Sequence, residues 1–190
     1  MNASTSASTR WGPGLPACRS GRASARIKVG GRGETNVATG LPVLDHLLAT
    51  LAVYASFDLA LEVEPGSAEL EITAAGRSLG EALHEPLRAD GARGHGSAVV
   101  PADEALAHVA LEASGRPLLV SNVDLSQARI AGLAGDLAAR FLDELAQTAG
   151  LTLHVRLVEG KDTQHVLEAI FKALGVALAQ ACRPRRRKDE

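Results

Sequence analysis

The chain has 190 residues, of which 46% are hydrophobic, 22% are charged and 3% are aromatic, and its formal net charge is −2. This length and composition suit one soluble globular domain, or two small fused halves, with a core of Leu, Val, Ala and Ile. The near-neutral charge gives no general attraction to nucleic acid, and no apolar run reaches membrane-spanning length. We therefore expect neither a nucleic-acid nor a membrane partner.

The two ends of the chain differ in composition from the rest. Residues 1–22 are rich in Ser, Thr, Gly and Pro and lack the apolar stretch of a signal peptide, so we expect a disordered arm and a cytoplasmic protein. Residues 183–190 carry the basic cluster RPRRRK, which is either a solvated tail or a site for an anion or partner. Cys18 and Cys182 are too few and too far apart for a disulfide framework, and we expect two free thiols.

Residues 23–95 form the first half of the expected domain. ARIKV at 25–29 alternates between apolar and polar residues, as a strand does. TNVAT at 35–39 is predicted to be a return strand after a glycine turn. At 41–55, apolar side chains recur at helical spacing, with Pro42 in the first turn. A strand pair followed by a helix is therefore expected here.

The same half continues with a second alternating stretch. FDLALEVEP at 57–65 is a strand by its alternation, and AELEI at 68–72 repeats that pattern after a Pro–Gly turn. SLGEALHEPLRADG at 78–91 predicts a short helix that Pro86 kinks or ends.

Residues 96–182 form the second half. The predicted elements are strands at 108–114, 116–123 and 151–160 and helices at 136–149 and 163–182. VLDHL in the first half is similar to FLDEL in the second, and FDLALEVEPG is similar to LTLHVRLVEG. This echo predicts an α+β fold, a duplicated two-half domain with helices on one face of mixed or antiparallel sheets.

Candidate metal ligands lie at the start of the last helix. His165 and Glu168 are three residues apart and share a helix face, and imidazole with carboxylate but without thiolate suits Mn, Fe or Zn. The alternative is an ordinary polar first turn on a buried helix. Likewise, PADEALAHVALEASGRPLLV carries Asp103, Glu104 and Arg116, which fit either a site or a polar loop before two strands.

Four ordered stretches resemble one family, the imidazoleglycerol-phosphate dehydratases of histidine biosynthesis. TGLPVLDHLL at 39–48 is similar to the family's TG-spacer-LDHML segment, and the stretch at 96–120 to its GSA-x-VPMDEAL…SGRP segment. LTLHV at 151–155 is similar to its TLHI strand, and EGKDTQHVLEAIFKALGVAL at 159–178 to its G-x-N-x-HH-x-x-EA-x-FKA helix. Order and spacing agree from about 25 to 181.

The resemblance implies a fold of two similar halves (ribosomal protein S5 domain 2-like) and a homo-oligomer built from trimers, in the family up to shells of 24 subunits. It implies manganese ions bound at subunit contacts through histidines and glutamates of an HH-x-x-E motif in each half. The implied reaction removes water from imidazole glycerol phosphate without a redox cofactor, by Lewis-acid and general acid–base catalysis.

Residues of this chain match the family's site positions one by one. His46, His154, His165 and Glu168 match metal ligands, and we assign the catalytic roles to His46 and Glu168. We assign binding of the phosphate substrate to three further residues. These are Arg116 of SGRP, Arg93 beside the position of a family arginine, and Glu104.

Several positions depart from the family pattern. Gln164 stands where the first histidine of the second pair belongs, and no histidine lies between His46 and His84, so the first pair is absent. Its glutamate is absent too, unless Glu69 or Glu71 substitutes. We therefore expect one manganese site at most and impaired or altered dehydratase activity. The alternative is a non-catalytic paralogue, a structural or regulatory subunit that works beside an intact homologue.

Overall fold

The computed structural model describes residues 18–20, 22–124, 129–130 and 133–185, so most of the predicted arm and tail lies outside the described residues. The helices are α1 (Pro42–Ala55), α2 (Ala68–Arg88), α3 (Gly135–Ala149) and α4 (Thr163–Cys182). The strands are β1 (Cys18–Ser20), β2 (Ala23–Lys28), β3 (Thr35–Ala38), β4 (Asp58–Val63), β5 (His95–Ala102), β6 (Ala105–Glu112), β7 (Leu118–Ser121), β8 (Arg129–Ile130), β9 (Leu133–Ala134) and β10 (Thr152–Glu159). Strand β1 lies within the segment for which the sequence predicts an arm.

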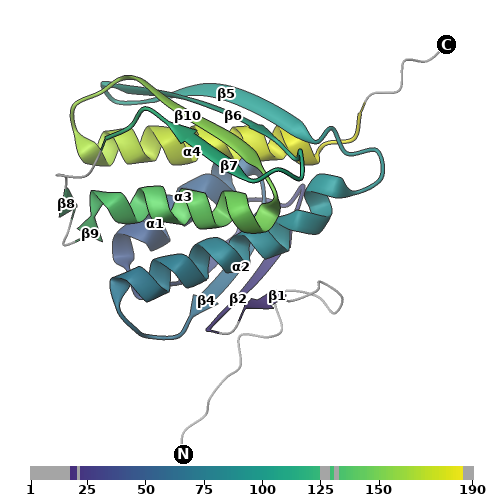
Figure 1. Ribbon diagram of the computed structural model, residues 1–190, viewed down its shortest axis with the longest axis horizontal. Helices are drawn as coiled ribbons and strands as arrows, with labels where there is room; N and C mark the ends of the chain where they lie inside the picture. The colour runs from purple at the N-terminus through teal and green to yellow at the C-terminus, as the bar shows by residue number, and fades with distance from the viewer. Residues whose placement is uncertain (1–17, 21, 125–128, 131–132, 186–190) are drawn as a thin grey trace, which may run out of the picture.

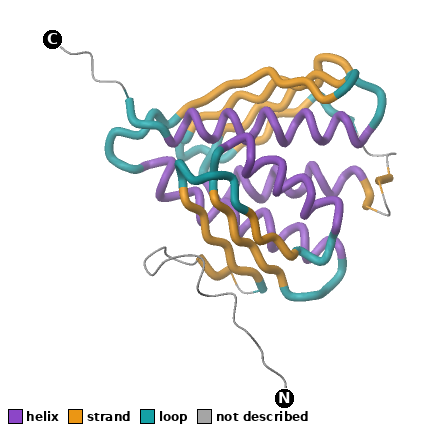
Figure 2. The backbone as a smooth tube through the Cα atoms, turned by 180° about the vertical axis from the view of Figure 1, so that it is seen from behind, coloured by secondary structure: helices purple, strands orange, loops and turns teal. Residues whose placement is uncertain are grey.

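Two four-stranded sheets enclose the four long helices, as Figures 1 and 2 show. One sheet has the order β1-β2-β4-β3 and the other β5-β6-β10-β7. In each sheet the last pairing is parallel and the other two are antiparallel. Apolar side chains on the inner faces of both sheets and on the helices form one buried core. This confirms the predicted α+β fold with helices on one face of mixed sheets.

The two halves have the same topology, which confirms the predicted duplication. In each half the third strand runs parallel to the fourth, and the second lies on the other side of the fourth. Strand β4 is thus equivalent to β10, helix α1 to α3, and helix α2 to α4. The N-caps Ser67 and Asp162 occupy equivalent places at the starts of α2 and α4.

Glycines let the helices of the two halves approach closely. A Cβ on Gly175 of α4 would lie 2.5 Å from the carbonyl oxygen of Leu51 on α1, and a Cβ on Gly80 of α2 would overlap Thr148 on α3. Gly80 and Gly175 are equivalent positions, so both pairs of crossing helices use the same solution. The absent side chains allow backbone-to-backbone contact at the centre of the fold.

Helix α2 corrects the prediction of a strand at 68–72. Ser67 caps the helix by accepting a hydrogen bond from Leu70 N, and the Glu71 carboxylate accepts one from Gly66 N at 2.8 Å. Alternation would place Leu70 and Ile72 on one face, yet Leu70 is 48% exposed and Ile72 is buried. Five residues are too few to separate the two periods, and the longer helical repeat prevails. Pro86 lies inside the last turn of α2 without ending it.

Two strands also differ from prediction. The first four residues of TNVAT form β3, but β3 pairs in parallel with β4, not with the neighbouring strand β2. Residues 95–102 form β5, which the sequence did not indicate because Gly96 and Pro101 disfavour a strand. Strand β5 is at the edge of its sheet, where Pro is tolerated because its missing N–H faces outward.

Helix α4 is the central helix of the core. By its length and its mean hydropathy of 1.3, an apolar stretch of this helix would suit a membrane span. However, 67% of that stretch is buried inside the protein. Phe171 on α4 stacks on Phe141 of α3, with ring centroids 5.6 Å apart. Cys182 at its end is a free thiol, as predicted, and burial raises its pKa to about 12. The side chain of Cys18 lies outside the described residues.

Candidate metal and substrate site

The N-terminus of α4 is joined to the β5–β6 turn by a short polar network. Asp162 caps the helix, since its Oδ1 accepts hydrogen bonds from Gln164 N at 2.9 Å and His165 N at 3.3 Å. The turn holds Asp103 in the left-handed region, with a φ of 48°. Its next residue, Glu104, accepts hydrogen bonds through Oε1 from the backbone N–H of Asp162 and of Lys161.

His165 is bound to the same carboxylate. Its Nδ1 lies 2.5 Å from Glu104 Oε2, and its Nε2 lies 3.5 Å from Asp103 Oδ2. The hydrogen bonds from Asp162 N and His165 hold the pKa of Glu104 at about 2. In turn, the hydrogen bond to Glu104 raises the pKa of His165, against the opposing effect of desolvation. The pair therefore favours an ionised carboxylate beside an imidazole that protonates readily.

A second group lies around Glu168, one turn further along α4. His46 Nε2 on α1 is 3.5 Å from Glu168 Oε1, which also accepts a hydrogen bond from Gln164 Nε2 at 3.1 Å. Lys172 Nζ is 4.0 Å from Glu168 Oε2 and 5.7 Å from the ring centroid of Tyr54. A carboxylate that is only 17% exposed thus has a cation, an imidazole and an amide around it. Lys172 is not among the residues predicted from the sequence, although its i,i+4 spacing from Glu168 could have indicated it.

His154 lies apart from both groups. It is in the middle of β10, opposite Ala110 of β6 and Val120 of β7, and it is exposed. Its neighbours Leu153 and Val155 are buried, so His154 faces away from the helices, as its alternation predicts.

The two arginines lie at the opposite end of the same sheet. The Arg116 carbonyl accepts a hydrogen bond from Thr152 Oγ1, at the start of β10, whereas α4 begins beyond the end of β10. Arg93 donates a hydrogen bond to His95 at the start of β5. At about 3.3 Å per strand residue, roughly 20 Å separate these arginines from His165 and Glu104. The structure therefore brings together His46 with Glu168 and His165 with Glu104, but not the arginines with either.

These donors suit a divalent ion by their chemistry, since imidazole and carboxylate are the ligands that Mn, Fe and Zn prefer. Their arrangement within one chain is incomplete. Across the part of the chain that the structure describes, no three His, Cys, Asp or Glu side chains come together as a metal site. One chain alone offers pairs of donors, which is too few to hold such an ion firmly.

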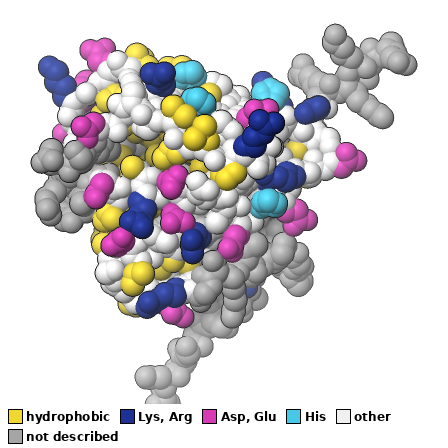
Figure 3. Space-filling model, in the orientation of Figure 1, with side chains coloured by type: hydrophobic (Ala, Val, Ile, Leu, Met, Phe, Trp, Pro, Cys, Tyr) yellow, Lys and Arg dark blue, Asp and Glu magenta, His cyan; other side chains and the backbone are white. Residues whose placement is uncertain are grey.

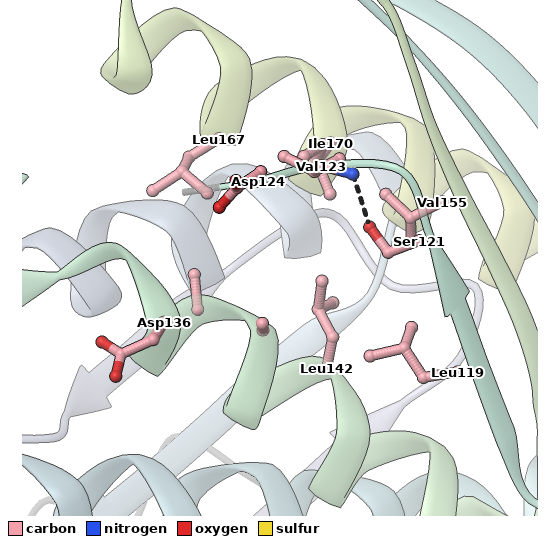
Figure 4. A pocket seen from close by; sticks show the side chains of 11 residues that line it. Leu119, Ser121, Val123, Asp124, Asp136, Leu142, Val155, Leu167 and Ile170 are labelled. Atoms are coloured by element: carbon pink, nitrogen blue, oxygen red, sulfur yellow. Dashed lines mark hydrogen bonds between the residues drawn. The ribbon is translucent and has the colours of Figure 1, made fainter. Parts of the chain in front are cut away.

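The cavity shown in Figure 4 is separate from these groups. It has a volume of about 170 Å³ and lies between β7, α3 and α4, with Leu142, Leu167 and Ile170 in its wall. None of the predicted site residues lines it. On the face drawn in Figure 3, acidic and basic side chains are interspersed, without a large patch of one charge.

Known proteins resemble this chain over most of its length. The family model for imidazoleglycerol-phosphate dehydratase matches residues 39–178. The enzyme of that name from Syntrophobacter fumaroxidans is 42% identical over 166 residues, which cover 84% of this chain and 83% of the relative. The one from Pelobacter propionicus is 38% identical over 162 residues, or 83% of each chain. The chain belongs to the imidazoleglycerol-phosphate dehydratase family.

Solved structures of the family agree with this fold. The dehydratase from Staphylococcus aureus superposes with a TM-score of 0.83 at 27% identity, over 90% of this chain and 99% of that one. The enzyme from Pyrococcus furiosus gives a TM-score of 0.78 at 27% identity, over 92% and 97%. Membership in the dehydratase family places the chain among proteins of histidine biosynthesis.

The internal duplication lets the two half-sites of this dehydratase-family chain be compared. Counting from the N-caps, the helical positions of Gln164, His165 and Glu168 in α4 correspond to Glu69, Leu70 and Thr73 in α2. In the equivalent strands, His154 of β10 corresponds to Ala60 of β4. The first half therefore has no imidazole at any of these positions.

An arginine is bound at the first half-site instead. Arg140 of α3 donates to Glu69 Oε1 at 2.7 Å and to Thr73 Oγ1 at 3.2 Å. One turn further along, Arg77 pairs with Glu144 at 2.8 Å. Glu71 is 7% exposed and accepts the hydrogen bond from Gly66 N. The carboxylates of Glu69 and Glu71 are thus both engaged in contacts within the protein.

Proposed function

We propose that this family member carries a reduced dehydratase site, with one manganese ion at most and impaired or altered elimination of water from imidazole glycerol phosphate. The observation that supports the proposal is the contrast between its two equivalent half-sites. The second keeps His154, His165 and Glu168, whereas the first has Ala60, Leu70 and Thr73 at these positions. Arg140 binds Thr73 and the neighbouring Glu69 there. A reaction that relies on two metal ions is expected to slow when one binding site is lost.

His46, His154, His165 and Glu168 would hold the ion. Manganese, when bound, would supply Lewis-acid stabilisation of the substrate's negative charge. His46 and Glu168 are the groups of this chain that we assign to proton transfer, because imidazole and carboxylate are the usual general acids and bases and these two lie beside each other. Gln164 would keep Glu168 in place through its amide hydrogen bond, and Arg116 and Arg93 would bind the phosphate by charge.

A homo-oligomer would complete this site. His165 and Glu104 lie at the opposite end of the second sheet from Arg93 and Arg116, so a substrate that touches both groups needs two copies of the chain. Trimers, and shells of 24 built from them, are the assembly that we propose, in keeping with the family resemblance. A cytoplasmic location accompanies this proposal.

Turnover tests the proposed activity. The purified full chain is incubated with imidazole glycerol phosphate and added Mn²⁺, and product formation is compared with that of the His165→Ala variant. We expect slow turnover that the substitution abolishes. Turnover that persists unchanged in His165→Ala would show that the assigned residues do not carry the reaction.

A second candidate is a non-catalytic paralogue that serves as a structural or regulatory subunit of an intact homologue. The ion pairs Arg140–Glu69 and Arg77–Glu144 favour it, because they hold α2 against α3 without any metal. Copurification with an intact dehydratase, together with no turnover by the chain alone, would support this candidate over the first.

A further inference from the structure

We propose that Glu104 is a positioning residue that fixes the tautomer of His165, so that Nδ1 carries the proton and Nε2 presents its lone pair. The hydrogen bond between His165 Nδ1 and Glu104 Oε2 is 2.5 Å long. An ionised carboxylate can only accept hydrogen bonds, so the proton between the two groups belongs to Nδ1. In a neutral imidazole the other nitrogen, Nε2, is then the acceptor.

The Glu104 carboxylate is held in place from its other side. Its Oε1 accepts from Asp162 N at 2.9 Å and from Lys161 N at 3.4 Å, in the loop that leads into α4. The same loop residue, Asp162, binds His165 N through its own side chain. One carboxylate therefore fixes both the backbone before the helix and the ring orientation of His165.

The opposite ring nitrogen is the one left for a ligand. Nε2 faces Asp103 Oδ2 at 3.5 Å, too far for a good hydrogen bond, and the His165 side chain is 33% exposed. Imidazoles that bind metals commonly donate their second N–H to a carboxylate, which orients the ring and raises its basicity. The geometry thus assigns Glu104 to orienting His165, where the sequence alone suggested contact with substrate.

The tautomer can be read directly by long-range ¹H–¹⁵N NMR of the full chain, at about pH 9 so that imidazoles are neutral. The His165 signals are those that vanish in His165→Ala. We expect the wild-type ring to be protonated at Nδ1. In Glu104→Gln, the amide oxygen can still accept the two backbone N–H groups, which turns the NH₂ toward Nδ1, so we expect the ring to change to the Nε2–H tautomer.

Asp103→Asn is the matched control. It changes the adjacent carboxylate in the same turn, and Asn tolerates the left-handed backbone of residue 103. We expect this variant to keep the Nδ1–H tautomer. A wild-type ring protonated at Nε2, or a Glu104→Gln ring that stays protonated at Nδ1, would overturn the proposal. The wild-type spectrum alone shows which nitrogen of His165 carries the proton, whether or not the variant folds.

A second measurement rests on the proposed function. If His165 binds manganese, Glu104→Gln should weaken Mn²⁺ binding by about 10–100-fold, because such orienting partners have effects of that size. Isothermal titration with MnCl₂ measures this loss. A changed tautomer without any Mn²⁺ binding in the wild type would reject the metal site and leave the positioning role of Glu104 intact.

Discussion

His46 and Glu168 join the two halves of the molecule at the candidate site, with 3.5 Å between His46 Nε2 and Glu168 Oε1. The imidazole comes from α1 in the first half and the carboxylate from α4 in the second. The contact depends on the close crossing of these helices at Gly175. The duplicated fold therefore assembles this pair of donors from segments far apart in the sequence.

His46→Ala is expected to weaken Mn²⁺ binding, because it removes one imidazole donor from the site. Binding is measured by titration of the full-length oligomer with MnCl₂. His84→Ala is the control, since His84 lies near the end of α2 and contacts Arg88. Equal Mn²⁺ affinity in His46→Ala and in the wild type would remove His46 from the ligand set.

Mixing of subunits tests whether two copies share one site. His165→Ala and Arg116→Ala alter opposite ends of the second sheet, and each variant alone is expected to lose turnover. In closed oligomers reassembled at random from equal amounts of both, each shared site takes one end from each of two chains. About one quarter of the sites would then have both ends intact. Partial recovery of turnover is the expected result. Complete absence of recovery in verified mixed oligomers would contradict a shared site.

The Glu104–His165 pair predicts a pH-dependent contribution to stability. The pKa of Glu104 is lowered from 4.5 to about 2, so its contribution is present above pH 4.5 and is lost as the pH falls toward 2. The pKa of His165 is raised from 6.5, so its contribution is present below pH 6.5 and is lost as the pH rises through the folded-state pKa. The free energy of unfolding of Glu104→Gln should therefore differ most from wild type between pH 4.5 and 6.5.

Denaturant unfolding at a series of pH values measures this difference. Glu159→Gln, which alters an exposed carboxylate at the end of β10, is the control and should leave the pH profile unchanged. A Glu104→Gln profile parallel to that of the wild type over the whole range would contradict the ion pair.

Gly80→Ala is expected to destabilise the protein by about 1–3 kcal/mol, because the added Cβ would overlap Thr148 at the α2–α3 crossing. Ser78→Ala on the same helix is the matched control. The Ser78 hydroxyl is buried and has no hydrogen-bond partner among the described residues, so its removal should not lower stability. Thermal or urea unfolding compares the two, and a neutral Gly80→Ala would mean that the helices are less tightly packed.

The sequence predicted the short strands β2, β3, β6 and β7 as well as the elements with a long hydrophobic repeat. Helices α1, α3 and α4 and strands β4 and β10 carry such repeats, and the echo between the halves predicted the duplication. The prediction of a strand at the start of α2 was wrong because five alternating residues fit a helix equally well. The parallel pairing of β3 with β4 depends on packing between distant segments, which local patterns do not contain.

The candidate site was predictable only in part. The i,i+3 spacing of His165 and Glu168 indicated a shared helix face, and the structure places both at the start of α4. The partner of each was not visible in the pattern. Glu104 reaches His165 from a turn in another hairpin, and His46 reaches Glu168 from the other half, so both contacts exist only after folding.

The number of manganese ions bound per chain tests the central claim most directly, namely that one half-site is retained and the other is lost. The full-length oligomer is incubated with MnCl₂ and freed of excess metal by gel filtration. Its manganese content is then measured by inductively coupled plasma mass spectrometry. Retention of the second half-site alone predicts one ion per chain, and its loss in His165→Ala. A value near two ions per chain would contradict the loss of the first half-site, and the complete absence of bound metal would contradict the retention of the second.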